Sequence, residues 1–97
     1  MNVILSRRAV RDLENQLNFL IDAGSKRTAQ RLEIRVSEFL ERTLARFPRT
    51  GTFIGERELW ESWVPGTRLV VWYRVTANEL QVVRFWNTSQ DRQHSND

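Results

Sequence analysis

The stretch Thr67-Arg-Leu-Val-Val-Trp-Tyr-Arg-Val75, followed by Thr76-Ala-Asn-Glu79 and Leu80-Gln-Val-Val-Arg-Phe-Trp86, decides the fold. Val, Trp, Tyr and Phe fit the pleated surface of a sheet, and Ala77-Asn78 tolerates a turn. The stretch therefore predicts two antiparallel strands joined by a short turn.

The arginines of this strand pair have an unusual placement. Side chains alternate between the two faces of a strand. We expect one face to carry Arg68, Val70, Trp72 and Arg74 from the first strand and Val82, Arg84 and Trp86 from the second. Core packing alone does not require arginines and tryptophans on a shared face.

The segments before the strand pair predict a strand and two helices. Residues 2–5 are an apolar run, and Ser6 is a suitable N-cap for a helix that ends at Gly24. A second amphipathic helix follows Ser25 and ends at Pro48. The two helices form a hairpin.

A loop and a further strand complete the predicted order. Residues 48–57 contain two glycines and predict a loop, residues 58–64 predict a strand, and Pro65-Gly66 is a turn signal. The order is β-α-α-β-β-β. We expect an α+β fold, with the helical hairpin packed on a small, mainly antiparallel sheet.

The length and composition narrow the classes of protein. The 97 residues predict one domain over residues 1–97, with a polar tail from about residue 88 to 97. The chain has no cysteine, and His94 is its only histidine, so we expect no metal site and no cofactor. No segment is apolar enough for a signal peptide or a membrane span, which predicts a cytoplasmic protein.

Arginine supplies nearly all of the positive charge. Lys26 is the only lysine, and the calculated pI is near 10.5. Guanidinium binds carboxylate or phosphate through two parallel hydrogen bonds and stacks on aromatic rings. The bias suits an acidic protein partner or nucleic acid, and genomic base composition is the alternative explanation.

Two apolar residues lie away from the buried stripes of the predicted helices. Phe19 lies outside the apolar stripe of the first helix, and Ile34 lies nearly opposite the apolar stripe of the second. A ridge of arginines runs beside Ile34: Arg27, Arg31, Arg35, Arg42 and Arg46. The pattern indicates either a docking surface for an acidic amphipathic peptide or a solvated face.

A catalytic site is not expected. Arg68, Arg84 and Arg92 could hold a phosphodiester, but guanidinium is a poor general base. Tyr73 is the only tyrosine, and strand alternation places it on the face away from Arg68. If the chain cleaves RNA, it does so as a metal-free endoribonuclease that uses these three arginines.

Four segments together resemble the RelE/ParE superfamily of bacterial toxins from type II toxin–antitoxin pairs. They are Leu5-Ser-Arg-Arg-Ala-Val-Arg-Asp-Leu13, Leu44-Ala-Arg-Phe-Pro-Arg-Thr-Gly51, Arg68-Leu-Val-Val-Trp-Tyr-Arg-Val75 and Val82-Val-Arg-Phe-Trp-Asn-Thr-Ser-Gln-Asp-Arg92. They cover nearly the whole chain in the family's order. The resemblance implies the same β-α-α-β-β-β fold.

The branch of the superfamily decides the implied activity. RelE-type members are ribosome-dependent mRNA endonucleases, whereas ParE-type members inhibit DNA gyrase. Arg68 matches a catalytic arginine of RelE, but no tyrosine follows Asp91-Arg92, and Asn87 stands where many ParE-like sequences have a histidine. The first three segments are more similar to ParE, so a gyrase inhibitor is the first interpretation.

Two alternatives remain: a RelE-type endonuclease, and a degenerate toxin that only binds its antitoxin. All three interpretations imply a cognate, ParD-like antitoxin, while direct nucleic-acid binding stays open. The expected target-binding residues are Arg68, Trp72, Arg74, Arg84 and Trp86. The expected antitoxin-binding residues are Phe19, Arg27, Arg31, Ile34 and Arg35.

Overall fold

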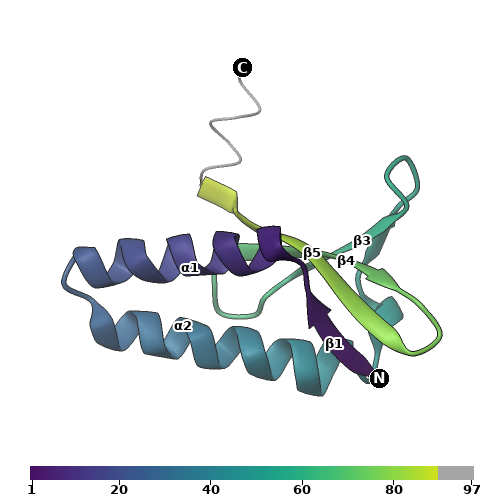
Figure 1. Cartoon of the computed structure of the whole chain (residues 1–97), viewed down its shortest axis with the longest axis horizontal. Helices are drawn as coiled ribbons and strands as arrows, with labels where there is room; N and C mark the ends of the chain where they lie inside the picture. The colour runs from purple at the N-terminus through teal and green to yellow at the C-terminus, as the bar shows by residue number, and fades with distance from the viewer. Residues whose placement is uncertain (90–97) are drawn as a thin grey trace.

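The computed structural model describes residues 1–89 and shows two helices packed on a five-stranded sheet (Figure 1). The elements are β1 (Asn2–Leu5), α1 (Arg7–Asp22), α2 (Lys26–Glu38), β2 (Thr52–Ile54), β3 (Leu59–Trp63), β4 (Leu69–Val75) and β5 (Glu79–Asn87). The predicted α+β fold is confirmed. Most of the predicted polar tail, including Arg92, lies outside the described residues.

The predicted strand pair occupies the middle of the sheet. The strand order is β1-β5-β4-β3-β2, so β5 and β4 each have neighbours on both sides. β1 pairs with β5 in parallel, and the other three pairs are antiparallel. The strand β2 was not predicted, because its three residues lie between two glycines in the segment expected to be a loop.

A β-bulge in β5 changes which of its side chains point toward the core and which point away from it. Trp72 pairs with Arg84, but the next residue, Tyr73, pairs with Val82, which leaves Val83 as an extra residue in β5. Val82 is therefore buried in the core, with 1% of its surface exposed. The expectation that Val82 shares a face with Arg84 and Trp86 is wrong.

The helical hairpin forms largely as the sequence predicts. The Ser6 hydroxyl accepts a hydrogen bond from the Ala9 N–H and caps α1, and Gly24 adopts a φ of +84° in the link to α2. A π-helical segment, Phe39–Leu44, continues α2. The helix ends there rather than at Pro48, and Phe47 is exposed.

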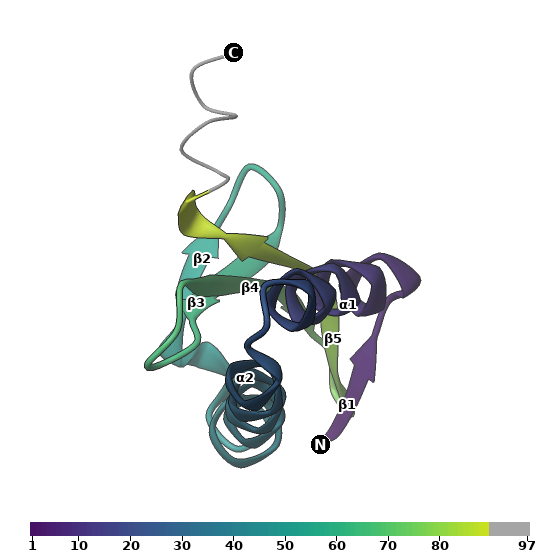
Figure 2. The ribbon, with the colours of Figure 1, turned by 90° about the vertical axis from the view of Figure 1, so that its left-hand side faces the viewer.

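The core lies between the hairpin and the inner face of the sheet. Its buried members come from both helices, the π-helical segment and the strands, and they include Ala9, Val36, Leu44, Val71, Leu80 and Phe85. Tyr73 is also fully buried, and its hydroxyl donates to the Pro48 carbonyl at 2.8 Å. Figure 2 looks along the hairpin and shows α1 beside β5.

Candidate functional site

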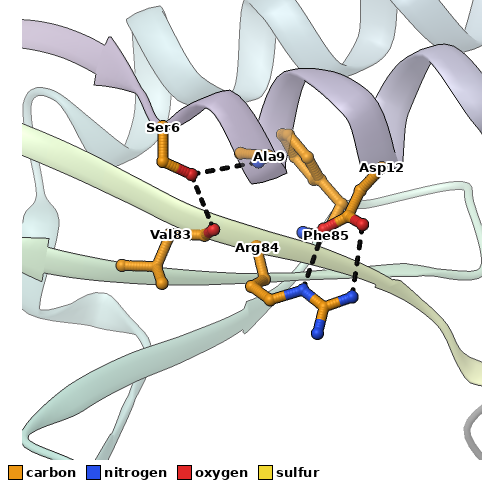
Figure 3. Close-up of polar contacts among 6 residues, drawn as sticks. All are labelled: Ser6, Ala9, Asp12, Val83, Arg84 and Phe85. Atoms are coloured by element: carbon orange, nitrogen blue, oxygen red, sulfur yellow. Dashed lines mark hydrogen bonds and ion pairs between the residues drawn. The ribbon is translucent and has the colours of Figure 1, made fainter.

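Two side chains, one from the N-cap of α1 and one from α1 itself, cover the part of the β5 edge that β1 does not reach. β1 pairs with β5 only as far as Val82, although β5 continues to Asn87. The Ser6 hydroxyl donates to the Val83 carbonyl at 2.8 Å, and an Asp12 carboxylate oxygen accepts from the Phe85 N–H at 3.1 Å (Figure 3). These contacts satisfy edge groups that would otherwise be open to another strand.

Asp12 also fixes the direction of Arg84. The carboxylate accepts from Arg84 Nε at 3.0 Å and from Nη2 at 3.2 Å, a two-point ion pair that Figure 3 shows between α1 and β5. The same guanidinium lies 3.9 Å from the centre of the Trp86 ring. Arg84 thus joins the hairpin to the outer face of the sheet, the face opposite the core.

The outer face carries a hollow of about 640 Å³, which we call the outer hollow. It is lined by Arg57, Leu59, Trp72, Arg74, Val83, Arg84 and Trp86. Trp72 and Trp86 meet edge to face, with ring centroids 5.2 Å apart. Four of the five expected target-binding residues are therefore brought together; Arg68 is not among them.

Three further residues of this face were not anticipated from the sequence. Glu61 accepts a hydrogen bond from Trp72 Nε1 at 2.7 Å, and the Arg57 guanidinium lies 5.2 Å from the centre of the Trp72 ring. Trp63 on β3 is 59% exposed. Strand alternation over residues 58–64 could have indicated Glu61 and Trp63, since they alternate with the inward residues, but Arg57 lies in a turn.

Arg68 belongs to a different hollow. It precedes β4, and its Nη1 donates to the Ser89 hydroxyl at 3.1 Å. It lines a space of about 470 Å³, the hairpin hollow, between the two helices and the β3–β4 turn. The expectation that Arg68 shares one site with Trp72 and Arg84 is therefore not met by the tertiary structure.

The hairpin hollow contains three of the five expected antitoxin-binding residues. Phe19, Arg31 and Arg35 line it, together with Arg68 and a floor that includes Leu20, Leu32 and Leu69. Phe19 is 70% exposed. Ile34 is also exposed, but neither Ile34 nor Arg27 lines this hollow.

Arg35 packs against the β3–β4 turn. Gly66 has a φ of +76°, and a Cβ at this position would collide with the Arg35 guanidinium. Position 66 therefore requires glycine for two reasons: the backbone has a positive φ, and the Arg35 guanidinium occupies the place of a Cβ. The contact holds the guanidinium at the rim of the hairpin hollow.

Tyr73 does not face either hollow. Burial raises its pKa from the ordinary value of 10.0, and a backbone hydrogen bond from Gly51 acts in the opposite direction. The phenol therefore stays protonated in the core. Within residues 1–89, no group of three or more His, Cys, Asp or Glu side chains is placed to hold a metal ion. No helix in that range is long and apolar enough to cross a membrane.

Two comparisons with known proteins agree with this architecture. A family model described as ParE toxin of type II toxin-antitoxin system, parDE, matches residues 3–92. A solved structure titled "Chromosomal ParDE TA system from P. aeruginosa" superposes with a TM-score of 0.69 at 14% identity, and the match covers 90% of this chain and 95% of that one. No curated protein matches the chain.

Proposed function

Because the chain belongs to the ParE toxin family of type II toxin–antitoxin systems, we propose that it inhibits growth by binding DNA gyrase. A ParD-like antitoxin neutralises it by covering the helical hairpin. The outer face of the sheet is the surface that contacts the target, with Trp72, Arg74, Arg84 and Trp86 at its centre.

The observation that carries the proposal is the composition of the outer hollow. Guanidinium groups and indole rings border it, and none of its lining residues is acidic. Aromatic and arginine side chains are the residues that dominate protein–protein binding energy. Trp63 adds an exposed indole on β3 beside Val70.

The placement of Tyr73 favours binding over RNA cleavage. Its hydroxyl donates to the Pro48 carbonyl in the core and faces away from Arg74 and Arg84, so it is not available for proton transfer on the outer face. Arg84 is held by Asp12, and Arg68 lies in the other hollow. Arg68 and Arg84, the two described arginines of those expected in a nuclease, therefore line different hollows.

The antitoxin surface is proposed on charge and exposure. Phe19 and Ile34 expose large apolar side chains on the hairpin, and Arg27, Arg31 and Arg35 lie on the same helix as Ile34. An acidic amphipathic segment would cover the apolar side chains and pair with the guanidinium groups. The hairpin hollow is lined by three of these residues, Phe19, Arg31 and Arg35.

The test is a gyrase supercoiling assay with purified toxin. We expect the toxin to inhibit supercoiling, and Trp63→Ala and Arg74→Ala to weaken inhibition at least about fivefold, as loss of a contact of about 1 kcal/mol requires. Arg8→Ala is the matched control, because Arg8 is an exposed arginine near the start of α1 and lines neither hollow. Equal inhibition by all variants would remove the outer face from the proposal.

The nuclease alternative is tested in parallel. Purified toxin is added to translating ribosomes, and mRNA ends are mapped. Codon-specific cuts without any effect on gyrase would overturn the gyrase proposal. A toxin whose induced expression leaves growth unchanged would support the third interpretation, a chain that only binds its antitoxin.

A further inference from the structure

We propose that the open edge of β1 is a docking site for an extended, basic segment of a further partner protein. The segment adds one strand to the sheet and carries an aliphatic side chain between two Lys or Arg residues. The site lies apart from the hairpin hollow and the outer hollow, and the inference does not depend on gyrase being the target.

β1 ends the sheet and pairs on one side only (Figure 1). The N–H groups of Asn2 and Ser6 donate to backbone carbonyls in and just before β5, each at 2.9 Å. In a parallel ladder, alternate residues of a strand bond to the same neighbour. The N–H and C=O groups of Val3 and Leu5 therefore face the open side, where no strand within residues 1–89 pairs with them.

The β1 edge lacks the features that usually protect an exposed strand edge. Charged side chains, proline or a bulge normally stop another chain from pairing there. Residues 1–5 contain no charged side chain and no proline, and β1 pairs with β5 without a shift of register. Met1 and Ile4 each expose 46% of their surface. This edge is therefore open to strand addition.

A small hollow lies between this edge and the helical hairpin, and we call it the β1 hollow. Its volume is about 170 Å³, and its apolar lining includes Val3, Leu5 and Leu13. An apolar cavity of about 150 Å³ can hold benzene, so the β1 hollow can take one aliphatic side chain. Because side chains alternate along a strand, an added strand directs every second side chain toward the hollow.

The charge around the β1 hollow is the reverse of the charge around the hairpin hollow. Glu33 and Glu41 line the β1 hollow, and no Lys or Arg does. Neither glutamate has an ion-pair partner in the part of the chain that the structure describes. Exposed carboxylates attract Lys and Arg and repel an acidic segment. An acidic segment suited to the hairpin hollow is thus unsuited to this site.

The spacing of the two glutamates matches an extended segment. Glu33 and Glu41 are eight positions apart, which corresponds to about 12 Å along a helix. Two side chains four positions apart on a strand point the same way and lie about 13 Å apart. Lys or Arg at such positions can reach one glutamate each, while the residue midway between them enters the β1 hollow.

A second copy of this chain is a poor occupant of the edge. An antiparallel pair of β1 strands related by a two-fold axis would place both hairpins on the same face of the joined sheet. The glutamates of the two copies would then face each other, and residues 1–5 supply no basic side chain to offset them. The charge therefore favours a different, basic protein segment.

The first test uses two short capped peptides and the full-length chain. One peptide carries arginine, leucine and arginine at alternate positions, separated by threonine, and the other has glutamate in place of arginine. We expect the arginine peptide to slow amide hydrogen exchange at Val3 and Leu5, because its carbonyls accept from these N–H groups. No protection at these two amides, or equal protection by the glutamate peptide, would overturn the inference.

A pair of charge reversals tests the role of the β1 hollow. Glu33 and Glu38 are both exposed on α2, but only Glu33 lines this hollow. Glu33→Lys should weaken binding of the arginine peptide about fivefold or more, since it replaces an attraction with a repulsion. Glu38→Lys makes the same change of net charge and should alter the affinity by no more than about twofold. Equal effects of the two substitutions would contradict the proposed site.

The remaining measurements decide between occupants. The preformed complex of toxin and antitoxin should bind the arginine peptide as tightly as free toxin does. Displacement of the peptide by antitoxin would assign the β1 edge to the antitoxin and overturn the inference. A dimer of the chain that the arginine peptide dissociates, as measured by analytical ultracentrifugation, would assign the edge to a second copy and overturn it too. None of these results depends on the outcome of the gyrase assay.

Discussion

The carboxylate of Asp12 and the guanidinium of Arg84 form a two-point ion pair that joins α1 to β5 across 72 positions of sequence (Figure 3). The same carboxylate accepts from the Phe85 N–H, and the same guanidinium packs on Trp86. One pair of residues therefore docks the hairpin, satisfies the edge of β5 and sets the shape of the outer face.

Removing this ion pair should destabilise the fold. Asp12→Ala leaves the Arg84 guanidinium and the Phe85 N–H without their acceptor, and we expect the free energy of unfolding to fall by about 2 kcal/mol. Asp12→Asn should cost less, because the amide oxygen still accepts from the Phe85 N–H. Urea unfolding measures both, with Glu14→Ala, an exposed acid on the same helix, as the control. A loss no larger than that of Glu14→Ala would contradict the role of Asp12.

The space at Gly51 gives a second prediction. A Cβ at this position would lie 2.5 Å from both the Glu61 carbonyl oxygen and the Tyr73 hydroxyl. Gly51→Ala should therefore destabilise the protein by about 1–3 kcal/mol, since the core must move to accept the methyl group. Gly55→Ala is the matched control, because its nearest neighbour would be Phe53 at 3.9 Å. Thermal unfolding measures the melting temperature of each variant, and we expect that of Gly51→Ala to be the lower. Equal melting temperatures would contradict the prediction.

The raised pKa of Tyr73 predicts that the folded protein loses stability in alkaline solution. Burial raises the pKa of Tyr73 in the folded chain, so above pH 10 the unfolded chain releases the phenol proton while the folded chain keeps it. The contribution is fully present below pH 10 and declines as the pH rises toward the raised pKa. Because Tyr73 is the only tyrosine, tyrosinate absorbance reports its ionisation directly.

Tyr73→Phe separates this effect from other alkaline effects. The variant should be less stable at neutral pH by about 1 kcal/mol, because the Pro48 carbonyl loses its donor. Its stability should then fall less steeply than that of the parent above pH 10. An identical slope in both proteins would show that Tyr73 does not cause the pH dependence.

The hairpin offers a pair of matched substitutions for the antitoxin surface. Phe19→Asp should weaken antitoxin binding by about 2 kcal/mol or more, since Phe19 is exposed and lines the hairpin hollow. Ile34→Asp introduces the same side chain at a similarly exposed position outside the hairpin hollow and should weaken binding less. Isothermal titration calorimetry with purified antitoxin measures both. A larger effect at Ile34 would move the docking surface to the outer side of α2.

The sequence predicted most elements of the fold but not their exact limits. Hydrophobic spacing and the Ser6 cap were sufficient for α1, and alternation was sufficient for β4. The sequence does not predict the short strand β2 or the bulge at Val83. Both depend on pairing with a neighbouring strand rather than on the conformational preference of the residues themselves. The π-helical end of α2 has no comparable local signal, and Phe47 continued the helical pattern beyond it.

The amino-acid sequence by itself determined the class of fold, the exposure of Phe19 and Ile34, and the arginine and tryptophan content of the central strands. These properties follow from local periodicity and side-chain chemistry. Only the tertiary structure decided that Arg68 lies with Phe19 rather than with Trp72, and that Asp12 holds Arg84. The reason is physical: the bulge in β5 and the docking of α1 on its edge bring together residues that no spacing rule along the chain connects.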